Sequence, residues 1–107
     1  MVMLVTIALY PHEAATKVAK KYLEMIKKNP PTPEISEAIA LCARATKKGL
    51  ETLSVANVKK GKVEEAMAAS ATFNQEFATS IEGYKWKITA YLDMVEAYKA
   101  VGMEPPE

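Results

Sequence analysis

The sequence predicts one α+β domain, in which four strands and two long helices follow the order β-α-β-β-α-β and a short helix comes last. Three observations support this prediction. The 107 residues are the length of a single domain. Short apolar or alternating runs, typical of strands, are interspersed with two longer stretches of helical periodicity. Glycines stand at the junctions between the later segments: Gly49, Gly61, Gly83 and Gly102.

The first strand and the first helix are marked by composition and by proline. Val2–Leu9 is a short run rich in β-branched residues, which favours a strand buried on both faces. Pro11 suits the first turn of a helix, and apolar residues then recur at helical spacing as far as Lys28. The prolines of residues 30–33 are expected to end this helix, because a residue before proline avoids the helical conformation.

The stretch Ser36–Thr46 fits two structures. As a helix, it has Ser36 as its N-cap, several alanines and Gly49 as a stop. As a strand, it alternates in side-chain size and forms a hairpin with the next segment across Lys47, Lys48 and Gly49. Local propensity favours the helix and topology favours the strand, so both remain open at this point.

The second half of the chain repeats the layout of the first. Leu50–Val58 is predicted to be a strand, Lys62–Ile81 a helix, Tyr84–Leu92 the clearest strand, and Met94–Val101 a short helix before a loose tail at Pro105-Pro106. Right-handed connections place both long helices on one face of a four-stranded antiparallel sheet. This is the ferredoxin-like arrangement.

Composition and charge exclude several classes of function. Lys and Arg exceed Asp and Glu by only one, whereas nucleic-acid binders carry a basic excess, so we expect no nucleic-acid partner. Met1–Tyr10 lacks the features of a signal peptide and is too short to cross a bilayer, so we expect a cytoplasmic protein without a membrane partner. The single cysteine, Cys42, excludes an internal disulfide and fits a reducing compartment.

The sequence also lacks cofactor motifs. Neither the G-x-x-x-x-G-K-[ST] nor the G-x-G-x-x-G phosphate-binding loop occurs. One histidine and one cysteine are too few for a structural zinc site. We therefore expect no metal and no cofactor.

Three segments carry a resemblance to a known group of proteins. They are Gly49–Val55 running into Gly61–Ala66, the corner Ile81–Tyr84, and Ala100–Met103 after the last strand and helix. These segments resemble small uncharacterised archaeal and bacterial ferredoxin-like proteins of the dimeric α/β-barrel kind. The resemblance covers most of the chain and implies that residues 38–46 form a strand and that two chains pair sheet to sheet as a homodimer. It implies no catalytic residue.

The two faces of the predicted sheet are assigned by the alternation of side chains. We expect the more apolar set to face the helices: Met3, Val5, Ile7, Leu9, Ile39, Leu41, Leu53, Val55, Trp86, Ile88 and Leu92. The open face then carries Leu4, Thr6, Ala8, Tyr10, Ala40, Cys42, Arg44, Thr52, Ser54, Ala56, Lys87, Thr89 and Tyr91. A face with so many small apolar groups is expected to be covered by a second copy of the chain.

A candidate ligand site follows from that open face. We expect Arg44 and Lys87 to hold an anionic group. Hydroxyl groups would add hydrogen bonds to the same ligand: Thr6, Tyr10, Ser54 and Tyr91. His12, the only histidine, stands at the start of the first helix and is the natural proton carrier. The plainer alternatives are solvated cations, ordinary strand hydroxyls and a surface histidine.

Three functions remain open from the sequence. The first is a homodimeric module that binds a small organic molecule, suggested to be anionic, between its paired sheets. The second is a non-catalytic structural or assembly module. The third is a cofactor-free enzyme of the dimeric-barrel type, with His12 or Tyr91 as proton carrier.

Overall fold

The structure is a computed structural model and describes residues 2–105. Its elements follow the predicted order: β1 (Val2–Tyr10), a 3-10 turn η1 (His12–Ala14), α1 (Ala15–Lys28), β2 (Ser36–Thr46), β3 (Gly49–Val58), α2 (Val63–Ser80), β4 (Lys85–Leu92) and α3 (Met94–Ala100). Of the predicted loose tail, Pro106 lies outside the described residues. No helix within the described part of the chain is long and apolar enough to span a bilayer.

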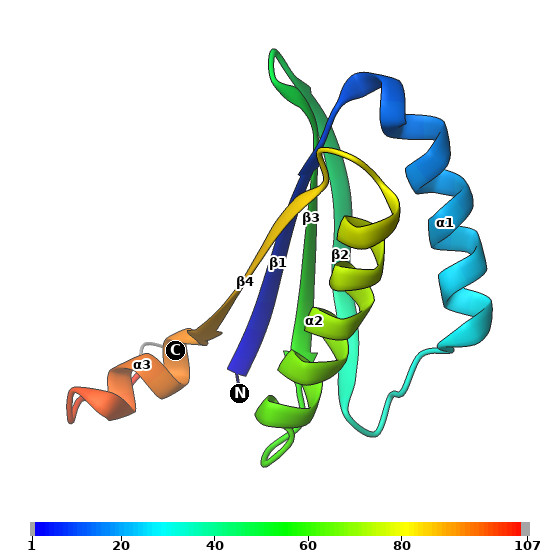
Figure 1. The fold of residues 1–107 in the computed structure, drawn as a ribbon. Coiled ribbons are helices and arrows are strands. Elements are labelled where there is room, and N and C mark those ends of the chain that lie inside the picture. The colour runs from blue at the N-terminus through cyan, green and yellow to red at the C-terminus, as the bar shows by residue number, and fades with distance from the viewer. Residues whose placement is uncertain (1, 106–107) are drawn as a thin grey trace.

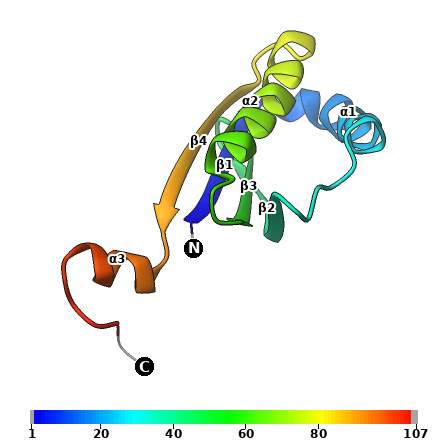
Figure 2. The ribbon, with the colours of Figure 1, turned by 90° about the horizontal axis from the view of Figure 1, so that it is seen from below.

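The four strands form one antiparallel sheet with the order β2-β3-β1-β4. Both long helices lie on the same face of this sheet, as predicted (Figure 1). Seen from below, α2 lies over the sheet and α1 lies on the side of α2 that is away from β4 (Figure 2). The other face of the sheet is left without a covering layer by the chain's own helices.

The stretch Ser36–Thr46 is a strand, so the helical alternative is wrong. It pairs with β3 from end to end, with a register shift between Ala38 and Ala40. The turn is fixed by Thr46, whose Oγ1 donates to the Gly49 carbonyl oxygen at 2.8 Å. A Cβ at Gly49 would lie 2.2 Å from the Tyr10 carbonyl oxygen, so only glycine fits there. This long-range pairing outweighs the helix propensity of the alanines.

The predicted faces are wrong for the two central strands. Leu4, Ala8 and Tyr10 are buried under the helices. Thr6 belongs to the same set, because its Oγ1 lies 3.1 Å from Ser70 Oγ of α2. In β3, the residues that pair with this side of β1 also face the helices: Thr52, Ser54, Ala56 and Val58. Met3, Val5, Ile7, Leu9, Leu53 and Val55 therefore point to the open face.

The physical reason lies in the size of the side chains. Val2–Leu9 is apolar in both phases of its alternation, so hydrophobicity could not select the buried one. The structure places the small residues of β1 and β3 beneath the helices. On the edge strands the assignment is confirmed for the paired residues, whereas Ile39 lies in the register shift of β2 and is not tested. Trp86 and Ile88 lie on the helix side opposite Ala8 and Thr6, and Lys87 and Thr89 lie on the open side. Likewise, on β2, Cys42 and Arg44 lie opposite Leu53 and Glu51.

The core sits mainly between α2 and the sheet. One cluster of buried residues lies toward the end of β1, and another toward its start. The first contains Tyr10, Ala14, Val18, Met25, Phe77 and Ile81, and the second contains Leu4, Val58 and Ala66. Phe77 and Ala66 are among the buried residues of α2. The two helices meet edge to face at Tyr22 and Phe73, with 6.2 Å between the ring centroids.

The last helix, α3, projects beyond the end of β4, away from the rest of the fold (Figures 1 and 2). Asp93 caps it, because its Oδ1 accepts from the Glu96 backbone N–H at 2.9 Å. None of the residues 94–100, all of which the structure describes, is buried. Large apolar side chains in and around α3 are exposed: Leu92, Met94, Val95, Val101 and Met103.

Candidate functional site

Two adjoining grooves lie between the helices and the sheet. The inner groove, of about 640 Å³, is bounded by α1, α2 and the helix-covered side of β1, β2 and β3. The loop groove, of about 810 Å³, continues from it to the connection between α1 and β2. They share five lining residues: Thr6, Ala38, Ser54, Ser70 and Phe73. The shared residues show that the two grooves lie directly next to each other.

The inner groove exists because many of the side chains that the sheet offers beneath α1 are small. Its floor includes Ala8, Ala38, Ala43 and Ser54. The larger side chains of α1 do not fill the remaining volume. Tyr22 and Ile26 line the groove and each keeps 36% of its surface exposed. Protein interiors are normally packed without such gaps, so a hollow with an apolar lining is a candidate binding site.

A chain of hydrogen bonds runs along one wall of the inner groove. Tyr84 OH donates to Asn74 Oδ1 at 2.9 Å, and Asn74 Nδ2 donates to the Ser70 carbonyl oxygen at 2.8 Å. The Ser70 hydroxyl in turn lies 3.1 Å from the Thr6 hydroxyl. Asn74 is only 6% exposed, so these contacts supply the partners that a buried amide needs.

Tyr10 and Tyr84, which both line the inner groove, are held as neutral phenols. Tyr84 stacks on Tyr10, with ring centroids 5.9 Å apart and nearly parallel planes, and on Phe77 at 5.3 Å. Burial, together with a smaller contribution from the nearby Tyr10, raises the pKa of Tyr84 to about 12. Burial also raises the pKa of Tyr10. Near neutral pH these groups therefore serve as hydrogen-bond donors and apolar surfaces, not as bases.

The seven predicted ligand residues do not come together in one place. Thr6, Tyr10 and Ser54 line the inner groove, on the helix-covered side of the sheet. Arg44, Lys87 and Tyr91 belong to strands β2 and β4 and point to the open face. His12 lies in η1, just after β1, where its Nε2 donates to the Thr46 carbonyl oxygen at 2.8 Å.

The two predicted anion-binding cations lie far apart. Arg44 is on β2 and Lys87 is on β4, which are the opposite edges of the sheet. Three strand spacings separate them, or about 14 Å. Arg44 Nε also donates to Glu51 Oε1 at 3.0 Å, so a carboxylate already pairs with it. Within one chain, these two side chains cannot hold the same small anion.

Sequence reasoning missed the polar wall of the groove. Neither Ser70 nor Asn74 is among the site residues predicted from the sequence. The signal was there, because two polar residues four positions apart interrupt an otherwise apolar helical stripe. Tyr84 was missed because its position depends on how the corner after α2 turns back toward β1.

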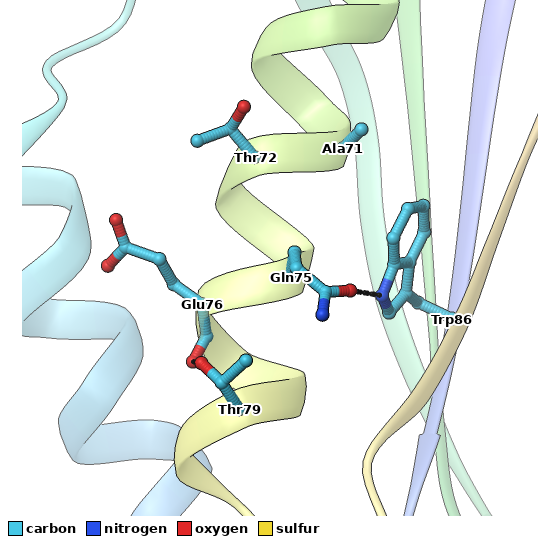
Figure 3. Close-up of a pocket in the computed structure, with 6 residues that line it drawn as sticks. All are labelled: Ala71, Thr72, Gln75, Glu76, Thr79 and Trp86. Carbon is cyan, nitrogen blue, oxygen red and sulfur yellow. Dashed lines mark hydrogen bonds between the residues drawn. The ribbon is translucent and has the colours of Figure 1, made fainter.

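A separate depression of about 520 Å³ lies beside α2 and β4 (Figure 3). Trp86 Nε1 donates there to Gln75 Oε1 at 3.3 Å, and Glu76 points away from the indole (Figure 3). This contact ties β4 to α2 and leaves few polar groups directed into the depression. Within residues 2–105, no cluster of three or more His, Cys, Asp or Glu side chains is arranged to hold a metal ion.

No protein-family model and no curated protein matches the sequence. Two solved structures are similar. The de novo designed protein Foldit4 has a TM-score of 0.53 and 14% identity, over 86% of this chain and 96% of that chain. A dimeric ferredoxin-like protein from an uncultured marine organism has a TM-score of 0.51 and 13% identity, over 85% of this chain and 92% of that chain. At these identities the likeness establishes the architecture alone: the chain has a ferredoxin-like fold.

Proposed function

We propose that this chain is a homodimeric module whose two sheets pack against each other through their open faces. The observation that carries this proposal is the apolar surface on the two central strands. It consists of Met3, Val5, Ile7, Leu9, Leu53 and Val55, which we call the central strip. One similar structure is that of a dimeric protein, which supports self-association of this fold.

The open face has the anatomy of a protein interface. In the rows across the sheet, Ile7 lies between Leu53 and Lys87, and Val5 lies between Val55 and Thr89. The end row carries charge on both sides of Leu9, at Glu51 and Lys85. An apolar centre with a polar rim is what a buried interface shows. A sheet face this apolar is costly to leave in water, and a second copy removes that cost.

The last helix belongs to the same proposal. Figure 2 shows α3 on the opposite side of the sheet from α1 and α2, the side on which the partner would pack. Its exposed apolar residues, Met94 and Val95 among them, would then contact the partner's surface. In the dimer, α3 would therefore enlarge the interface that is centred on the central strip.

Two other candidates receive less support from the geometry. The ion pair between Arg44 and Glu51 favours assembly over anion binding at this face, because a carboxylate already pairs with the guanidinium. An enzyme using both His12 and Tyr91 would need them near one substrate. His12 follows the end of β1, whereas Tyr91 lies opposite Met3 near its start. They are therefore at opposite ends of the sheet.

The proposal is tested by placing a charge in the central strip. Val5→Lys should weaken self-association at least about 30-fold, because a lysine ammonium would be buried without a partner at the centre of the interface. Sedimentation equilibrium over a range of protein concentrations measures the dissociation constant. The matched control is Thr16→Lys, which also exchanges a β-branched residue for lysine but lies on the exposed surface of α1. A Val5→Lys protein that is folded and dimerises as tightly as the wild type would refute the proposed interface.

A further inference from the structure

We propose that the inner groove is a binding site for an uncharged, largely apolar small organic molecule that carries one polar group. This site lies on the helix-covered side of the sheet, and it is complete within one chain. It therefore does not depend on the proposed dimer.

The size of the groove fits a small ligand. Its volume of about 640 Å³ lies inside the range of roughly 300–1,000 Å³ that is usual for small-molecule pockets. The adjoining loop groove provides a route to solvent past Pro30 and Pro31. A ligand that enters there would reach the junction at Ser54 and Phe73, which line both grooves.

The lining of the groove is mostly apolar, and part of this apolar surface remains exposed to water. Leu23 and Leu41 line it from opposite sides, on α1 and β2, and they remain 59% and 58% exposed. Deeper in, Phe77 and Val18 belong to the core. A bound apolar molecule would remove the exposed leucine surfaces from water, which is the main driving force for binding in such sites.

The polar groups of the groove suit one hydrogen-bonding substituent on the ligand. The hydroxyls of Thr6 and Ser70 lie 3.1 Å apart, and each hydroxyl can both donate and accept. Ser54 lies beside Thr6 on the neighbouring strand, in the same row. An alcohol, carbonyl or amide on the ligand would find its partners at this cluster.

The absence of charge sets the class of ligand. Among the described residues that line the inner groove, none carries a formal charge near neutral pH. Of the two adjoining grooves, Lys28 and Glu76 line the loop groove and not the inner one. An ionised ligand would lose its hydration in the inner groove without gaining a counter-ion, so neutral molecules are preferred.

The test compares two fluorescent probes of similar size that differ in charge. N-phenyl-1-naphthylamine is neutral, and 8-anilinonaphthalene-1-sulfonate is an anion. The neutral probe should bind saturably, and the anion at least about tenfold more weakly, because the groove offers it no cation. Equal affinity for the two probes would overturn the assignment to uncharged ligands.

Two leucine substitutions locate the binding. Ser54→Leu fills the junction of the two grooves and should lower the affinity for the neutral probe at least about tenfold, because the added side chain occupies the ligand's volume. The control is Ala45→Leu, on the helix side of β2 beyond the groove, opposite Leu50. It should bind the probe like the wild type. A folded Ser54→Leu protein with unchanged affinity would refute the site.

The wild-type protein provides a measurement that needs no variant. In amide NMR spectra, the neutral probe should shift residues of the groove, such as Ala43, Ser54 and Asn74, more than those of the central strip, such as Val5 and Leu53. Shifts confined to the central strip would mean that the probe binds the open face, and they would overturn the proposal even if Ser54→Leu fails to fold.

Discussion

The two faces of the sheet differ in a way that reverses the usual expectation. The side chains under the helices include many small ones, such as Thr6, Ala8 and Ser54, whereas the open face of the central strands carries Val5, Ile7 and Leu53. Small side chains let α2 pack closely on the sheet, and they leave the inner groove beneath α1. Bulky side chains stand where the chain has no covering layer of its own. The difference is the basis of both proposals, in which a second copy of the chain covers the larger side chains and a ligand fills the space over the smaller ones.

The largest expected effect comes from the helix-covered side. Phe77 is 2% exposed and belongs to the main core cluster. Phe77→Ala should lower the free energy of unfolding by about 3–5 kcal/mol, because it removes buried surface and leaves a cavity. Denaturant titration at a protein concentration that favours monomer measures it.

The matching change on the open face is Leu53→Ala. It should lower the monomer's free energy of unfolding much less than Phe77→Ala does, because Leu53 is only half-buried there. Its main effect should appear as weaker self-association. If Leu53→Ala destabilises the monomer as much as Phe77→Ala does, the two faces do not differ as described.

A smaller effect is expected at the polar wall of the groove. Tyr84→Phe removes the hydroxyl that donates to Asn74 Oδ1 and leaves a buried acceptor unpaired. The free energy of unfolding should fall by about 1–3 kcal/mol. Tyr91→Phe is the control, because Tyr91 is 55% exposed on the open face and its loss of a hydroxyl should change monomer stability little. Thermal or denaturant unfolding of both variants gives the comparison, and equal losses would contradict it.

The same tyrosine predicts how stability depends on alkaline pH. The pKa of Tyr84 is about 12 in the folded protein against 10.0 ordinarily, so above pH 10 the phenol ionises more readily in the unfolded chain. The contribution of Tyr84 to stability is therefore complete below pH 10 and is lost as the pH rises from 10 to about 12. Denaturant midpoints across this range should fall less steeply in Tyr84→Phe. Parallel curves for the wild type and the variant would show that Tyr84 is not responsible.

The smallest effect is expected at α3, the helix that projects from the end of β4. Asp93→Ala removes the side chain that accepts from the Glu96 N–H at the start of α3. Hydrogen exchange of the α3 amides should become faster, while the global unfolding midpoint should stay close to that of the wild type, because α3 buries none of its residues in one chain. A large fall in the midpoint would mean that α3 is part of the core.

The order of strands and helices could be predicted because each element has its own periodicity or its own stop signal. The strand Ser36–Thr46 could not be decided locally, since its alanines favour a helix and only the pairing with β3 selects a strand. The face of β1 could not be decided either, because both of its phases are apolar.

The candidate site was predicted only in part. Thr6, Tyr10 and Ser54 were selected, and they do line a groove, but on the side of the sheet opposite to the expected one. Arg44 and Lys87 were assigned to one site only because the alternation of side chains places both on the open face. That alternation does not show that their two strands lie at opposite edges of the sheet. The contact between Tyr84 and Asn74 depends on tertiary packing, which no local pattern contains.

The central claim is that a second copy of the chain covers the open face. Native mass spectrometry of the purified wild-type protein, at the concentrations at which a stable homodimer persists, tests it most directly. We predict a dominant species of twice the chain mass, and loss of that species in Val5→Lys but not in Thr16→Lys. A folded wild-type protein that remains at the mass of one chain would contradict the claim.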